Sequence, residues 1–227
     1  MKRAQAGHLV ADSIGLSLLA DRPIKRWDAV VKTSVDLLIG GLVTVLLLPL
    51  LAIIALAIRF DSPGPVIFKQ RRHAQYNREF EILKFRTMQW NASAAAQDLR
   101  QTSRRDERIT SLGRFLRASS LDELPQLFNV LKGDMSLVGP RPHAVDMRTE
   151  GRLGHEITDL YPQRHRVKPG ITGWSQVNGA RGATDTVEQL HRRVTLDLHY
   201  IENWSLLLDL KILALTSREV IKGTNAY

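Results

Sequence analysis

The sequence has no cysteine, few aromatic residues and none of several common catalytic motifs. Without cysteine, disulfide bridges, thiolate zinc sites and cysteine nucleophiles are excluded. The seven histidines show no HExxH spacing, and neither a GxSxG nor an Asp-x-Asp motif occurs. These absences argue against a zinc hydrolase, a hydrolase with a serine nucleophile elbow and the usual metal-dependent nucleotide-sugar glycosyltransferase.

The chain is basic, with 32 Lys and Arg residues against 23 Asp and Glu and a formal net charge of +9. This balance favours anionic partners: nucleic acid, phospholipid head groups or phosphorylated substrates. The aromatic residues, 6% of the chain, do not interleave with a basic stripe as a nucleic-acid stacking surface requires. The length of 227 residues suits one domain with a core, or a domain plus a membrane element.

Residues 37–58 form an uncharged apolar run. At about 1.5 Å per residue, a helix of this length would cross a bilayer core of about 30 Å. Pro49 lies near its middle, where it removes a helical hydrogen bond and strains the preceding turn. We expect Thr44 to help satisfy the freed backbone groups.

Basic residues flank both ends of this run, whereas a spanning helix should have one side poor in them. They are Lys25, Arg26 and Lys32 before it and Arg59, Lys69, Arg71 and Arg72 after it. The pattern favours a re-entrant helix-break-helix over residues 25–60 that bends near Pro49 and leaves by the same face. An ordinary span with a kink is the alternative.

The sequence predicts an α+β fold, mostly helical with a short β-hairpin. Residues 1–24 would be a peripheral extension and 61–227 the main domain. Two short strands, Val66–Phe68 and Phe80–Phe85, would form the hairpin. Residues 161–182, rich in Gly, Pro and Arg, would be mostly loop.

The remaining elements are predicted to be helices of different kinds. Leu112–Leu116 and Leu124–Leu131 are short helical stretches, the second ended by Gly133, and residues 91–107 predict a surface helix or loop. Ile201–Ile221 reads as an amphipathic helix that faces the core or lies on the bilayer surface.

The densest polar cluster contains adjacent carboxylates, Asp122 and Glu123, just before Pro125. Five arginines precede them closely: Arg104, Arg105, Arg108, Arg114 and Arg117. The pair could be catalytic. Alternatively, Ser120 and Glu123 have the spacing of a capping box, in which a carboxylate serves only to begin a helix.

Two further segments have phosphate-binding character. Pro140 and Pro142 restrict the backbone around Arg141, which suits bidentate contact between its guanidinium and a phosphate; an ordinary turn with a solvated arginine is the alternative. Closely spaced glycines and basic residues in 164–182 would let backbone N–H groups approach a ligand, although no P-loop or dinucleotide fingerprint is present.

Read together, these segments resemble the bacterial sugar transferases, the monotopic polyprenyl-phosphate phosphoglycosyltransferases. The resemblance covers roughly residues 25–225 and is most specific in the run from Arg108 to Pro142. Ala74 departs from the family's usual glycine, and Leu48-Pro49 stands where some members have Ser-Pro. The other matching blocks are PGPVIFKQRR (63–72), FEILKFRTM (80–88), VKPGITGWSQVNG (167–179) and DLHYIENWSLLLDLKIL (197–213).

The resemblance implies an activity and roles for individual residues. Asp122 would attack the β-phosphate of a UDP-sugar and release UMP, Glu123 would help hold Mg2+, and Arg141 would bind phosphate. The phosphosugar, a hexose phosphate by analogy with exopolysaccharide-initiating members, would then pass to undecaprenyl phosphate. By proximity to these motifs, secondary substrate contacts are assigned to Arg114, Lys168, Arg181 and Asp197.

The resemblance also implies a location and partners. The re-entrant hairpin and amphipathic interfacial helices would hold residues 61–227 at the cytoplasmic face of the bacterial inner membrane, in contact with its lipid and without nucleic acid. The oligomeric state stays open, a homo-oligomer included. Two other functions remain to be distinguished: a lipid-linked glycosyltransferase that moves sugar without phosphate, and a membrane-tethered basic binding module.

Overall fold

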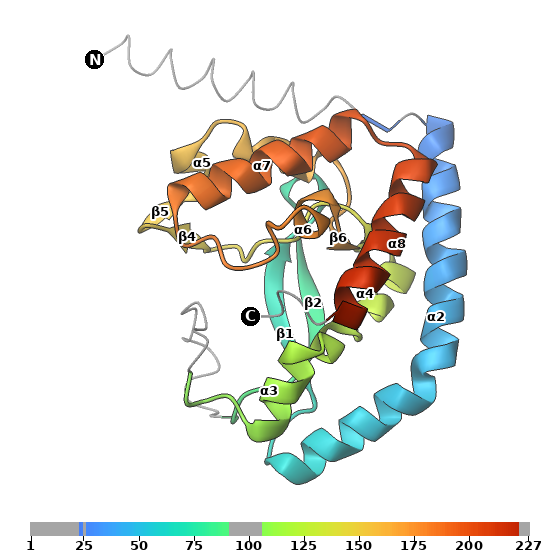
Figure 1. The fold of residues 1–227 in the computed structure, drawn as a ribbon, viewed down its shortest axis with the longest axis vertical. Coiled ribbons are helices and arrows are strands. Elements are labelled where there is room, and N and C mark those ends of the chain that lie inside the picture. The colour runs from blue at the N-terminus through green and yellow to red at the C-terminus, as the bar shows by residue number, and fades with distance from the viewer. Residues whose placement is uncertain (1–22, 25, 91–105, 223–227) are drawn as a thin grey trace.

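The structure is a computed structural model that describes residues 23–24, 26–90 and 106–222. The predicted extension 1–24 lies outside this part except for its last two residues, and so does nearly all of the segment 91–107. A long helix, α2 (Arg26–Asp61), runs along one side and the lower edge of the body in Figure 1. The other α-helices are α3 (Ser111–Ala118), α4 (Gln126–Lys132), α5 (Gly154–Ile157), α6 (Trp174–Val177), α7 (Val187–Glu202) and α8 (Leu206–Lys222).

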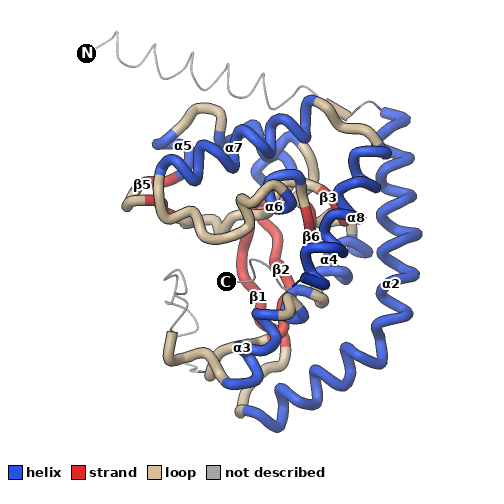
Figure 2. Tube along the Cα trace, viewed as in Figure 1, coloured by secondary structure: helices blue, strands red, loops and turns tan. Residues whose placement is uncertain are grey.

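The strands are short and form three separate pairs rather than one large sheet (Figure 2). In the predicted hairpin, β1 (Ile67–His73) pairs antiparallel with β2 (Glu79–Phe85), with Ile67 opposite Phe85. β3 (Ser136–Val138) pairs in parallel with β6 (Gly170–Thr172). A third, minimal pair joins β4 (Arg148–Thr149) to β5 (Arg152–Leu153). The mixed, mostly helical α+β architecture is therefore confirmed.

Helix α2 buries one narrow stripe against the body and exposes the rest of its apolar surface. Its buried residues recur every three or four positions, as the helical period requires, except for a gap of seven around Pro49. The stripe consists of Lys32, Asp36, Gly40, Thr44, Leu51, Ile54 and Ile58. Exposed apolar side chains on the other faces include Leu38, Leu42, Val45, Leu46, Ile53, Leu56 and Phe60. By length and composition, Trp27–Asp61 could cross a membrane.

The two arms of α2 contact the same body. Near its start, Asp36 accepts a hydrogen bond from the Leu137 backbone N–H in β3. Beyond Pro49, Leu51 and Ile54 join a buried cluster with Phe85 and Leu116, from β2 and α3. The helix bends without a break in its secondary structure (Figure 1). The expected role of Thr44 is wrong, since its hydroxyl donates to the Gly40 carbonyl at 2.6 Å, one turn away from the carbonyl that Pro49 leaves free.

The core lies where α4, α7 and α8 cover the β3–β6 pair. Leu190, Val194, Leu198 and Ile201 line the inner face of α7, which was not predicted. The single helix predicted for Ile201–Ile221 is in fact divided, because α7 ends at Glu202 and α8 begins at Leu206. Likewise, 161–182 is not mostly loop: it contains a 3-10 helix (η3, Tyr161–Arg166), β6 and α6. The predicted helices around α3 and α4 are confirmed, including the stop at Gly133.

A buried arginine closes the end of the long helix. Arg86 follows β2 and donates to the carbonyls of Ile58, Ser62 and Pro63 at 3.4, 2.6 and 3.0 Å. A cation at this position also suits the negative end of the helix dipole. Gly64, with φ +118°, lies so close that a Cβ there would be 2.3 Å from Arg86 Nη1.

This crowding predicts that Gly64→Ala destabilises the protein by roughly 2 kcal/mol, because the methyl group displaces Arg86 and the backbone conformation disfavours a side chain. Gly151→Ala is the matched control: Gly151 also has a positive φ (+78°), but nothing lies within 4 Å of its Cβ position. Thermal unfolding of both variants should show the larger loss for Gly64→Ala; equal losses would show that Arg86 does not constrain this turn.

Candidate active site

A tight turn between α3 and α4 positions the predicted carboxylate pair. Thr110 caps the start of α3 by accepting a hydrogen bond from the Gly113 N–H at 2.9 Å. After α3, Ser120 adopts a left-handed conformation (φ 60°), and a 3-10 turn (η2, Leu121–Glu123) leads into Pro125 and α4. The chain reversal buries Asp122, which is only 8% exposed, at the beginning of α4.

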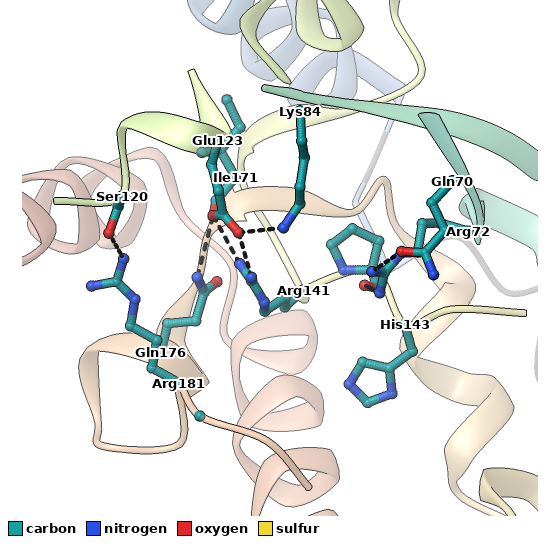
Figure 3. A network of polar contacts seen from close by, with 12 residues as sticks. Gln70, Arg72, Lys84, Ser120, Glu123, Arg141, His143, Ile171, Gln176 and Arg181 are labelled. Carbon is teal, nitrogen blue, oxygen red and sulfur yellow. Dashed lines mark hydrogen bonds and ion pairs between the residues drawn. The ribbon is translucent and has the colours of Figure 1, made fainter. Parts of the chain in front are cut away.

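The capping-box alternative is wrong. The Ser120 side chain makes no cap; its hydroxyl accepts a hydrogen bond from Arg181 Nη2 at 2.6 Å (Figure 3). The Glu123 carboxylate is directed away from the helix start, toward Lys84 and Arg141. Both side chains of the supposed capping box are therefore engaged with residues distant in sequence.

Glu123 is held by two cations. Lys84 Nζ donates to Oε1 at 2.8 Å, and the Arg141 guanidinium bonds both carboxylate oxygens, at 2.5 and 3.1 Å (Figure 3). Burial opposes ionisation of this carboxyl group, but Arg141 and Lys84 outweigh it and hold the pKa of Glu123 well below its usual range. The alternative of a solvated Arg141 is also wrong, because this side chain is 20% exposed and bidentate to Glu123.

Asp122, the neighbour of Glu123, is in a different state. Within the described part of the chain, no hydrogen bond or ion pair engages its carboxylate. Burial raises the pKa of Asp122 to about 6; Lys84 opposes the rise, and the negative charge of Glu123 adds to it. The result is a carboxylate that is ionised at neutral pH and whose lone pairs are not occupied by any of the described residues, as a nucleophile requires.

The backbone of Arg141 is fixed from behind by a buried ion pair. Arg164 Nη2 donates to the Arg141 carbonyl at 2.9 Å, while Arg164 Nε donates to Asp197 Oδ2 at 2.7 Å. The side chains of Arg164 and Asp197 are each 1% exposed. Asp197, predicted as a substrate contact, therefore lies behind the site. His143 Nδ1 lies 3.0 Å from Arg164 Nη1, and burial together with Arg164 and Arg193 holds the pKa of His143 well below its usual range.

The loop that carries Arg181 is fixed by α7. Arg193 donates to the Ala180 carbonyl at 2.8 Å and to the Gly182 carbonyl, and these two residues flank Arg181. Arg181 then reaches Ser120, two residues before Asp122. The structure thus brings Arg181 to the turn that bears the carboxylate pair.

Two other predicted site residues lie elsewhere. Arg114 donates to the Ile109 carbonyl and to Ser111 Oγ, and it lines a separate open cavity of about 620 Å3 beside Trp90. Lys168 Nζ lies near Gly133, at the end of α4 opposite the carboxylate pair. Neither is among the described partners of Glu123 or Ser120.

Lys84 and Arg117 were missed as site residues, although the sequence carries a signal for one of them. In β2, Phe80 and Ile82 are buried, so the alternation of a strand places Lys84 on the same inner face. A lysine on a buried strand face is rarely left without a partner. Arg117 Nε donates to Thr87 Oγ1 at 2.8 Å. Its positive charge is among those that oppose the rise in the pKa of Asp122.

Comparison with known proteins identifies the family of the chain. The family model described as "Bacterial sugar transferase" matches residues 27–223. The chain belongs to the bacterial sugar transferase family. Asp122 and Glu123 lie within the matched residues, together with Lys84 and Arg141. The buried ion pair of Arg164 with Asp197 lies within them as well.

Curated relatives extend the comparison. The chain is 52% identical over 93% of its length to an undecaprenyl-phosphate glucose phosphotransferase of Komagataeibacter xylinus, covering 40% of that protein. It is 46% identical over 86% of its length to a UDP-glucose:undecaprenyl-phosphate glucose-1-phosphate transferase of Caulobacter vibrioides, covering 72%. It is 42% identical over 82% of its length to the exopolysaccharide production protein PSS of Rhizobium leguminosarum, covering 92%. The chain thus spans about two fifths of the first of these relatives and most of the other two.

The donor set suits one kind of metal ion. Among the described residues, no group of three or more His, Cys, Asp or Glu side chains could hold a metal alone. Asp122 and Glu123 offer two carboxylates, and Mg2+ is typically bound by one or two carboxylates plus substrate phosphates and water. These bacterial sugar transferase residues therefore fit Mg2+ brought together with a diphosphate.

The raised pKa of Asp122 predicts that Asp122→Asn stabilises the fold at pH 7.5. The folded pKa of about 6 exceeds the ordinary value of about 3.9, so ionisation costs stability as pH rises between these values. At about 1.4 kcal/mol per pKa unit, the variant should gain about 3 kcal/mol, a Tm rise of roughly 6–12 °C.

The gain should shrink as pH falls from 6 to 4, because wild-type Asp122 then becomes neutral as well. Asp134→Asn is the control: Asp134 pairs with Lys132 in the turn after α4, so removing its charge should not raise the Tm at pH 7.5. Equal Tm for wild type and Asp122→Asn at pH 7.5 would contradict an ionised, poorly stabilised Asp122.

Proposed function

We propose that the chain transfers a sugar 1-phosphate from a UDP-sugar to undecaprenyl phosphate and releases UMP. The observation that carries this proposal is the contrast within the acid pair: Glu123 is neutralised by Lys84 and Arg141, while Asp122 is buried, unbonded among the described residues and raised in pKa. The names of the curated relatives support the donor and the acceptor. Because the names of these relatives specify glucose, UDP-glucose is the first hexose donor to test.

The reaction would proceed in two displacements at one phosphorus atom. An Asp122 oxygen attacks the β-phosphorus of the UDP-sugar, the bond from this phosphorus to the bridging oxygen breaks, and UMP leaves with that oxygen. A phosphate oxygen of undecaprenyl phosphate then attacks the same phosphorus and expels the Asp122 carboxylate. Each step forms one P–O bond and breaks one, and the product is a lipid diphosphosugar.

The cations around the acid pair make the first step electrostatically feasible. A carboxylate that approaches a diphosphate meets like charges, so the phosphate oxygens must be neutralised. Arg141 is the residue best placed to exchange Glu123 for phosphate, because its guanidinium offers two parallel N–H groups. Lys84 and Arg117 contribute positive charge beside Asp122. Mg2+ held by Glu123 and Asp122 would withdraw further charge from the diphosphate.

We further propose that α2 enters and leaves the cytoplasmic face of the bacterial inner membrane without crossing it. Both arms of the helix pack on the same body, as described above, whereas a spanning helix would carry one arm to the opposite side. The exposed leucines and isoleucines of α2 would then contact lipid. This topology brings Asp122 within reach of a lipid acceptor whose phosphate stays at the membrane surface.

Intact-protein mass measurement tests the chemistry. Incubation with UDP-glucose and Mg2+ but no acceptor should add a phosphohexose to the peptide with Asp122 and release UMP. Asp122→Asn should form no adduct, whereas Asp134→Asn should match wild type. The rate of adduct formation should fall about tenfold per pH unit below about pH 6, because only ionised Asp122 attacks.

Other outcomes of this experiment favour the two alternatives. Release of UDP in place of UMP, once acceptor is added, would identify a glycosyltransferase that moves sugar alone. Binding of UDP-glucose without release of any nucleotide would favour a binding module. UDP-galactose, compared at the same concentration, tests whether the hexose is glucose.

The absence of cysteine allows a direct test of topology. Trp27 and Phe60, at opposite ends of α2, are 79% and 86% exposed, so Trp27→Cys and Phe60→Cys should both accept a membrane-impermeant maleimide. In intact spheroplasts neither variant should be labelled, and after permeabilisation both should be. Labelling of one end alone in intact cells would establish a spanning helix.

A further inference from the structure

A cluster of charged and polar side chains is buried where the membrane helix meets the body. Lys32 and Asp36 of α2 are 7% and 8% exposed, and Asp209 of α8 is 6% exposed. Lys32 Nζ lies 2.7 Å from Asp209 Oδ2 and 3.9 Å from Asp36 Oδ2. Tyr200 Oη and Trp204 Nε1 also donate to Asp209, at 2.8 and 3.2 Å. This cluster is separate from the partners of Glu123.

The cluster occupies the open edge of β3. Along its other edge, β3 pairs with β6 through Ser136 and Val138. The Leu137 N–H faces the opposite way, where a further strand would accept its hydrogen bond, and here Asp36 Oδ1 accepts it at 3.1 Å. Tyr200 Oη donates to the carbonyl of Val138, the next residue, at 3.1 Å. Side chains of α2 and α7 thus both bond the backbone of β3.

β3 leads directly into the loop that presents Arg141. Gly139 follows β3, and its N–H donates to the Thr172 carbonyl at 2.9 Å. A Cβ on Gly139 would be 2.5 Å from the Lys168 carbonyl, so the start of this loop is packed tightly against the segment that leads into β6, the partner strand of β3. A displacement of Leu137 would therefore be transmitted to Arg141 four residues later.

We propose that Asp36 is a positioning residue for Arg141, and that through it the seating of the membrane helix sets the geometry of phosphoryl transfer. This inference rests on the proposed function. Buried charges are costly unless paired, and apolar residues of similar size often stabilise a fold as well or better. A carboxylate that accepts a backbone N–H of β3 offers what an apolar residue cannot: a fixed acceptor at one point of that strand.

The test uses the full chain in phospholipid nanodiscs, with one disruptive and one conservative variant. Asp36→Leu removes the acceptor, whereas Asp36→Asn keeps an oxygen that can accept the Leu137 N–H. Thr44→Val is the matched control, because Thr44 is buried in the same helix and its hydroxyl bonds only within α2 among the described residues. Lys32 retains Asp209 as its partner in all three variants.

Two readouts separate positioning from stability. Asp36→Leu should slow formation of the Asp122 adduct about tenfold or more, since a shift of about 1 Å at a reacting group can cost a hundredfold. It should also speed hydrogen exchange of the amides at residues 136–141. Asp36→Asn should recover the adduct rate to within about threefold of wild type, and Thr44→Val should leave rate and exchange unchanged.

Three results would overturn the inference. They are a wild-type adduct rate and exchange pattern in Asp36→Leu, an Asp36→Asn variant as slow as Asp36→Leu, and an equal loss of rate in Asp36→Leu and Thr44→Val. The proposed function fails in a different way, if wild-type protein itself forms no adduct. In that case the exchange of the Leu137 amide still shows whether Asp36 holds β3.

Discussion

The ion pairing of Glu123 is the interaction on which the site depends. Ionising two adjacent buried carboxylates has a high free-energy cost, because their negative charges repel and burial disfavours the charged form of each. Lys84 and Arg141 resolve this conflict for one of them, since both bond Glu123. Asp122 remains next to a neutralised neighbour, with its own oxygens free of described partners. The same contacts that stabilise Glu123 thus leave Asp122 as the acid to which the proposed function assigns the nucleophilic role.

The rest of the fold holds these cations in place. Lys84 comes from a strand, Arg141 from the loop after β3, and Arg181 from a loop fixed by α7. None is near another in sequence, so the site exists only when the hairpin, the β3–β6 pair and α7 are packed together. Arg164 is central to that packing, because its guanidinium joins Asp197 to the Arg141 backbone without contact with solvent.

The sequence predicts local features of this molecule better than the contacts between distant segments. Alternation and turn residues predict the β1–β2 hairpin, although the predicted first strand stops at Phe68 and β1 continues to His73, and Gly133 marks the end of α4 correctly. Helix α7 was missed although Leu190, Val194, Leu198 and Ile201 have helical spacing, because arginines and histidines between them dilute the apolar signal. Asp197 and Arg114 were assigned by proximity to motifs, but side-chain direction depends on tertiary packing: one lies in a buried ion pair and the other beside a separate cavity.

Under the proposed function, the position of the long helix links the chemistry to its acceptor. An amphiphile with a polyprenyl tail stays in the bilayer, so a nucleophile that serves it would have to be held at the interface. An apolar helix alone would provide attachment without orientation. Here α2 packs on β2 and α3 beyond Pro49 and on β3 before it, so its two arms fix the body at two points on either side of the bend. If α2 is the membrane anchor we propose, anchoring and active-site geometry depend on the same set of contacts, and the buried polar residues of α2 serve both.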